Sequence, residues 1–134
     1  MGATTELRKL ITAQLNALPG KTYHRQAEKN AAYPYKVYSL ERINTGDLSR
    51  LDYSLCVDLW DRAADWKTVE SMSDELTALF NAANLPQDNI LPTFFREDSY
   101  PVEDSDKEIQ HQQLHFTVQL YINHKEEAQW QMSN

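Results

Sequence analysis

The chain has 134 residues, enough for one domain with a single core of helices packed on a sheet. Its apolar fraction of 41% and charged fraction of 25% are ordinary for a soluble globular protein, and its short apolar runs exclude a transmembrane helix. With 13 basic and 20 acidic residues, it has a net charge of −7 and no basic cluster, which argues against tight binding of nucleic acid.

The first predicted element is an amphipathic helix at residues 4–18. Thr4 or Thr5 is expected to cap this helix, and Pro19-Gly20 is expected to end it. Its apolar residues recur at spacings of three and four and form one stripe, which consists of Leu7, Leu10, Ile11, Leu15 and Leu18. Residues 21–32 are polar. Within this segment, residues 22–24 are expected to form a short strand.

Two strands joined by a hairpin-type turn are predicted next. Residues 35–43 carry apolar side chains on both faces, which indicates a covered strand or a second contact surface. Gly46 supplies the turn. Residues 50–61 alternate strictly, and their apolar face consists of Leu51, Tyr53, Leu55, Val57 and Leu59. Trp60 lies on the opposite, polar face, near the end of the strand.

A second amphipathic helix is predicted at residues 65–83. Asp65 is expected to cap it, and Asn84-Leu85-Pro86 is expected to end it. Its apolar stripe, which we expect to pack on the sheet, consists of Val69, Met72, Leu76, Leu79 and Phe80.

The last third of the chain is predicted to form two strands around an acidic loop. Residues 90–96 form a short apolar strand, and Pro92 favours a sheet edge or a bulge for it. Residues 97–108 are typical of a mobile loop, because they contain Pro101 and the acidic residues Glu97, Asp98, Glu103, Asp104, Asp106 and Glu108. Residues 109–123 form the last strand, and the polar residues 124–134 are expected to be flexible.

Two helices and four or five strands in this order predict an α+β fold. We expect a single domain over residues 1–134, with an antiparallel or mixed β-sheet and both helices packed on one face. The single cysteine, Cys56, cannot form an internal disulfide and fits a reducing compartment; we expect it to be an inert, half-buried thiol. The N-terminus does not resemble a secretory signal, so assembly in the cytoplasm is expected.

The sequence does not support a catalytic or metal site. His111 and His115 are four residues apart on one strand, a separation of about 13 Å that is too long for shared coordination of one ion. Asp52 and Asp58 are roughly 20 Å apart on one strand, too far for paired carboxylates. The acidic loop lacks the ligand spacing and glycine of a calcium loop. We therefore expect a protein that is not an enzyme and needs no cofactor or metal.

Four aromatic residues fall on faces or in a tail that should be polar. They are Tyr38, Trp60, Tyr121 and Trp130. Because aromatic residues are enriched at protein interfaces, these four are candidate contacts with another subunit or another protein, unless a second layer inside the monomer covers them. The six acidic residues of the predicted loop are further candidates, and this loop and the tail could become ordered on assembly.

The order of the elements resembles a known family of viral assembly proteins. An N-terminal helix is followed by a strand that reads Tyr-Pro-Tyr-x-Val-Tyr at residues 33–38. A strand ending in Val-Asp-Leu-Trp-Asp at residues 57–61 and an amphipathic helix come next. This order is similar to that of the tail completion proteins of long-tailed bacteriophages, the tail-to-head joining or tail terminator proteins. The resemblance runs from about residue 7 to residue 122 and is clearest over residues 33–80.

The resemblance implies a role in the virion rather than in catalysis. It implies an α+β subunit of a ring, expected to be a hexamer, that caps the tail tube and meets the head connector or stopper protein. DNA would pass through this ring without specific binding, which an acidic surface would suit. Two alternatives stay open: a small cytoplasmic enzyme or ligand-binding domain with a pocket between sheet and helices, and a tail-tube or connector subunit.

Overall fold

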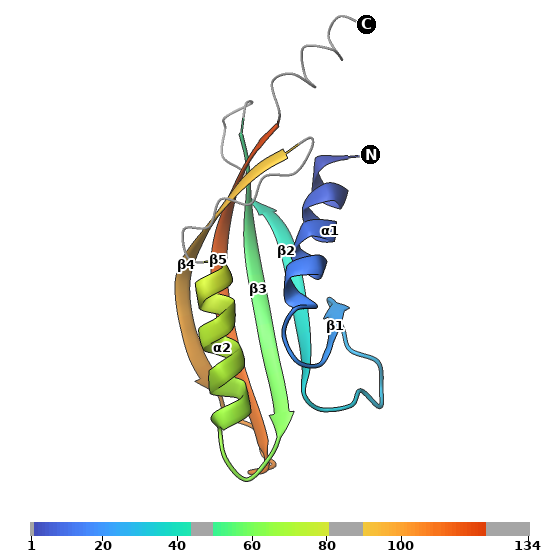
Figure 1. The fold of residues 1–134 in the computed structure, drawn as a ribbon, viewed down its shortest axis with the longest axis vertical. Coiled ribbons are helices and arrows are strands. Elements are labelled where there is room, and N and C mark those ends of the chain that lie inside the picture. Colours follow the sequence, from blue (N-terminus) through green and yellow to red (C-terminus); the bar gives the residue numbers. More distant parts are fainter. Residues whose placement is uncertain (1, 44–49, 81–89, 123–134) are drawn as a thin grey trace, which may run out of the picture.

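The computed structural model describes residues 2–43, 50–80 and 90–122. These residues contain two helices and one five-stranded sheet whose strand order is β1-β2-β3-β5-β4. The elements are α1 (Ala3–Leu15), β1 (Lys21–His24), β2 (Tyr35–Ile43), β3 (Arg50–Arg62), α2 (Lys67–Phe80), β4 (Ile90–Val102) and β5 (Ile109–Ile122). Strands β1 and β2 are parallel and the other neighbours are antiparallel, so the sheet is mixed. Both helices cover the same face of the sheet (Figure 1), which confirms the predicted α+β fold.

The core lies between the two helices and the sheet. The predicted apolar face of β3 is buried there from Tyr53 to Leu59, as are most residues of the two predicted helix stripes. Such alternation arises because successive side chains of a strand point to opposite faces. The largest fully buried side chains include Tyr53, Phe80, Phe94, Phe116, Leu7, Ile11, Leu15, Leu55, Leu59, Met72 and Leu76. Rings of α2 and the sheet pack directly, with the centroids of Phe80 and Phe94 4.4 Å apart.

The ends of α1 differ from the prediction. The N-cap is Gly2, and Thr4 lies inside the first turn, where its hydroxyl forms a 2.6 Å hydrogen bond with the hydroxyl of Tyr53 on β3. Thr4 and Thr5 are therefore not caps, because the helix starts earlier than predicted. The helix ends at Leu15, although Leu18, three residues later, is still buried in the core.

The largest correction concerns residues 97–102, which were expected to be part of a loop. They continue β4 up to Val102 and pair with β5, so Glu97 and Asp98 are strand residues. An irregularity in the register between Arg96 and Asp98 accommodates the extra residue in β4. Strand β4 lies at the edge of the sheet, as Pro92 indicated. The predicted turn at residues 44–47, the end of the second helix and the tail lie outside the described residues.

Candidate functional site

Neither described helix covers the second face of the sheet, and we call this face the open face. Alternation along each strand places on it five large apolar side chains, each 38% to 41% exposed. These residues are Ile43, Leu91, Phe95, Tyr100 and Tyr121. Leu91 and Tyr121 are direct neighbours across β4 and β5. Large apolar groups gathered on one sheet face indicate a contact surface more strongly than single exposed residues do.

The structure separates the predicted aromatic contacts. Tyr121 lies on the open face with 38% of its surface exposed, as a contact residue would. Tyr38 is only 3% exposed, and its hydroxyl is hydrogen-bonded to that of Thr12 on α1 at 2.9 Å. Tyr38 is thus a core residue, and its expected role in an interface is corrected, because α1 forms the second layer over it. Trp130 lies outside the described residues.

Trp60 is half-buried on the open face, in a stack of rings from neighbouring strands. Its indole lies 3.6 Å from the imidazole of His111 on β5 and 6.0 Å from the ring of Tyr35 on β2, measured between centroids. The ring of Tyr33 continues the stack, 5.3 Å from Tyr35, and the guanidinium of Arg62 lies 5.6 Å from the centroid of Tyr33. The stack covers much of Trp60 within the monomer and stiffens this end of the face.

A buried polar cluster lies beside this stack. His111 and Gln113 donate hydrogen bonds to Oδ1 of Asp58, at 2.6 and 2.8 Å. Burial alone would raise the pKa of Asp58, but these hydrogen bonds outweigh burial and lower it. The neighbouring Cys56 has a pKa raised to about 12 by burial and by the charge of Asp58, so its thiol is protonated and inert at neutral pH.

The acidic residues of β4 make local contacts on the open face. Glu97 accepts a 2.8 Å hydrogen bond from the hydroxyl of Thr117, and Asp98 lies 3.3 Å from Nδ1 of His115. The side chain of Asp98 nevertheless keeps 57% of its surface exposed. Their carboxylates therefore remain available to a partner beside the apolar residues of β4.

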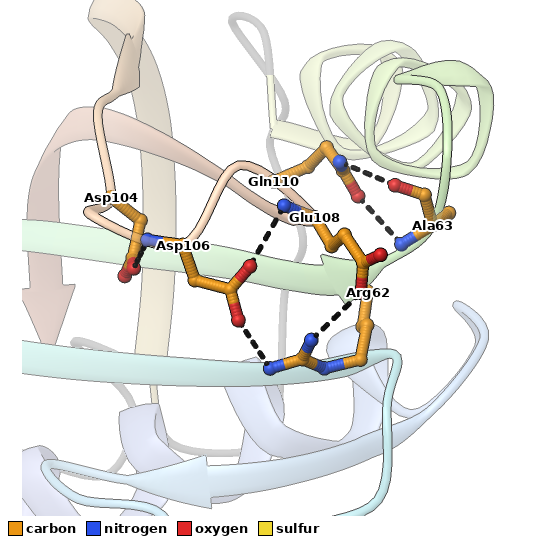
Figure 2. Close-up of polar contacts among 6 residues, drawn as sticks. All are labelled: Arg62, Ala63, Asp104, Asp106, Glu108 and Gln110. Atoms are coloured by element: carbon orange, nitrogen blue, oxygen red, sulfur yellow. Dashed lines mark hydrogen bonds and ion pairs between the residues drawn. The ribbon is translucent and has the colours of Figure 1, made fainter.

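The connection at residues 103–108 is tied to the end of β3 (Figure 2). Arg62 forms ion pairs with Asp106 at 2.9 Å and with Glu108 at 3.2 Å. Asp104 and Asp106 each accept a hydrogen bond from the backbone N–H two residues later. The pKa of Asp106 is lowered, first by its hydrogen bond from the Glu108 backbone and then by Arg62. Local sequence patterns could not identify Arg62 as a partner, because the ion pairs join residues that are 44 and 46 positions apart.

Two hollows on the described surface are wide and open. One lies between α1 and the strands β1 and β2, lined by Arg8, Lys9, Thr12, His24 and Tyr38. Another lies on the open face beside Tyr35, Asp58, Trp60 and His111. Small-molecule sites enclose most of their ligand, which these open hollows cannot do. The described residues contain no set of three or more side chains suited to a metal ion, and none of their helices is long and apolar enough to cross a membrane.

Comparisons with known proteins support the fold. No protein-family model matches the sequence, and no curated protein matches it either. Among solved structures, the chain is similar to one chain of "Virion of native gene transfer agent (GTA) particle", with a TM-score of 0.63. The two chains share 10% sequence identity, and the match covers 83% of this chain and 84% of the other. This likeness is one of fold, shared over most of both chains.

Proposed function

We propose that this chain is a structural protein of a virion that caps the tail tube of a long-tailed bacteriophage and joins the tail to the head. The likeness in fold to a chain of a gene transfer agent virion carries the proposal, because it extends over 83% of this chain. It agrees with the resemblance between the order of the sequence elements and that of tail completion proteins. The likeness in fold and the resemblance in element order both support a role in the assembly of a phage-like particle.

The surface suits a subunit that works by contact. The open face presents Leu91, Phe95 and Tyr121 to solvent, and such apolar groups become buried when a partner docks. The polar cluster around Asp58 is satisfied by internal hydrogen bonds rather than arranged for reaction. We therefore propose binding and ordering, not catalysis, as the mechanism.

The proposed assembly is a hexameric ring at the head–tail interface. One side of the ring would meet the tail tube protein, and the other would meet the head connector or stopper protein. The net charge of −7 would let DNA slide through the ring without binding to it. The subunits would be made in the host cytoplasm and would join the tail after the tube is complete.

Electron microscopy of particles made without this gene tests the proposal. DNA-filled heads beside separate tails are expected, and purified protein added to such a lysate should restore joined particles. Tails of abnormal length would add a role in length termination. Lysates without any tails would indicate a tube subunit instead, and normal, infectious particles would rule out both roles. In the experiment in which purified protein is added to the lysate, the control is protein that carries the charge-conserving substitution Asp74→Glu on α2.

A further inference from the structure

Charge is distributed unevenly along the described chain. Residues 2–43 contain seven Lys or Arg and three Asp or Glu, whereas residues 90–122 contain two Lys or Arg and six Asp or Glu. Strands β1 and β4, which belong to these two segments, form the opposite edges of the sheet. Figure 1 shows α1 beside β1 and β2 at one side of the sheet and α2 over β4 and β5 at the other. The subunit is therefore polarised from one edge of its sheet to the other.

The basic side consists of Arg8, Lys9, Lys21, Arg25 and Lys29 around α1 and β1. Lys21 has one acidic neighbour, Glu28 at 3.7 Å, and within the described residues Lys9, Arg25 and Lys29 form no ion pair. Burial lowers the pKa of His24, and the nearby positive charges of Arg8 and Arg25 lower it further. The cations of this side outnumber the acidic residues of the same part of the chain, so this edge keeps a positive field.

The acidic side consists of Glu97 and Asp98 on β4 with Glu103 and Asp104 in the following connection. Asp106 and Glu108 are excluded from it, because both carboxylates are already paired with Arg62. Three exposed apolar residues, Leu91, Phe95 and Tyr100, accompany these carboxylates on β4. An apolar centre beside charged groups is the usual composition of a protein interface.

We propose that the basic side of one copy binds the acidic side of the next copy, head to tail. The inference rests on the proposed ring and identifies its subunit contact. Heterologous contacts between two different surfaces generate closed rings, whereas a two-fold contact at either side would oppose like charges. The irregularity at Arg96 and the prolines Pro92 and Pro101 hinder addition of a strand to β4, so side chains mediate the contact.

Charge reversal on the purified full chain tests this contact by sedimentation. The variant Lys9→Glu/Arg25→Glu lowers the summed charge of the basic side from +5 to +1, and Asp98→Lys/Glu103→Lys changes that of the acidic side from −4 to 0. Each variant alone should associate about tenfold more weakly than the native chain or worse, since most of the attraction between the two sides is lost. An equal mixture should restore association, because contacts between two native sides then alternate around the ring with contacts in which the reversed residues of the two variants meet each other. A chain with all four substitutions should also associate, and the association of the native chain should weaken with added salt.

The matched control is Arg42→Glu/Lys67→Glu, which changes the net charge as much as the first variant but lies outside the basic side. Its association should stay within about threefold of the native value. Circular dichroism confirms that each variant is folded. The inference is overturned if the mixture and the fourfold variant fail to associate, or if the native chain stays monomeric up to about 1 mM. Neither result tests the proposed function. That function is tested separately, by electron microscopy of particles made without the gene.

Discussion

The ammonium group of Lys36 donates a hydrogen bond to the backbone carbonyl of Gly20 at 2.6 Å. It also reaches the carbonyls of Leu18 and Pro19, at 3.2 and 3.0 Å. Lys36 is fully buried on the core face of β2, so one cation binds the carbonyls of the turn that follows α1. Carbonyl groups near a helix end lack helical partners, and a buried lysine is an unusual donor to them. This link fixes the position of β1 and hence the geometry of the basic side.

Lys36→Met should lower the free energy of unfolding at pH 7 by about 1 to 3 kcal/mol, because three backbone carbonyls lose their donor. Burial lowers the pKa of Lys36 to about 8 from its ordinary 10.5. Between these two values the unfolded chain binds more protons than the folded chain, so Lys36 makes stability rise with pH. Urea unfolding at pH 7 and 9.5 should show this rise in the native chain relative to the variant. An identical pH dependence in both proteins would contradict the assignment.

Gly20→Ala should destabilise the protein by about 1 to 3 kcal/mol. Gly20 has a φ of 87°, and a Cβ added there would overlap the carbonyl oxygen of Pro34. Gly2→Ser is the control, since a Cβ at Gly2 meets nothing within 4 Å and serine is a good N-cap. Thermal unfolding of the two variants compares them directly. Equal melting temperatures for Gly20→Ala and the native chain would show that the turn adopts another conformation.

Trp60 and Tyr121 should respond differently to replacement by alanine. Trp60→Ala removes the central ring of a stack, so the monomer should lose about 1 to 3 kcal/mol of stability. Tyr121→Ala should cost less, about 1 kcal/mol or below, because the side chain is 38% exposed and its hydrogen bond is to Arg50. Its effect should instead appear as loss of particle joining. Chemical denaturation measures the stability of each variant, and an add-back assay measures particle joining. The reverse pattern would assign the structural role to Tyr121 and the contact role to Trp60.

Cys56 should resist alkylation in the folded protein. Burial and the charge of Asp58 raise its pKa to about 12, so thiolate is scarce at pH 8. Iodoacetamide should therefore label Cys56 far more slowly in buffer than in urea, as followed by mass spectrometry. Equal labelling rates in the two conditions would show that the thiol is exposed and ionised.

The fold could be predicted where one face of an element is apolar. Strand β3 alternates cleanly, and its buried apolar residues Tyr53, Leu55, Val57 and Leu59 were identified from the period alone. In β2 both faces carry apolar groups, so alternation could not indicate that Lys36 points inward. The length of β4 was missed because its acids and Pro101 are typical of a loop, whereas pairing with the distant β5 holds it as a strand.

The candidate surface was less predictable than the core. Tyr121 was identified because it interrupts a polar face, but Phe95 and Tyr100 were not. In a regular strand Phe95 and Tyr100, five residues apart, would lie on opposite faces. They both lie on the open face because the irregularity between Arg96 and Asp98 shifts the alternation by one residue. Tyr38 was misassigned because only the packing of α1 shows that its strand face is covered. Such effects depend on contacts between distant segments, which local patterns do not contain.

The most direct test of the proposed function is a cryo-electron microscopy reconstruction of the head–tail junction of the phage that carries this gene. The proposal predicts one ring of this α+β fold between the end of the tail tube and the head connector. In that ring, β4 of each subunit should face β1 of its neighbour. Density for this fold repeated along the tube, or absent from the junction of complete particles, would contradict the proposed role.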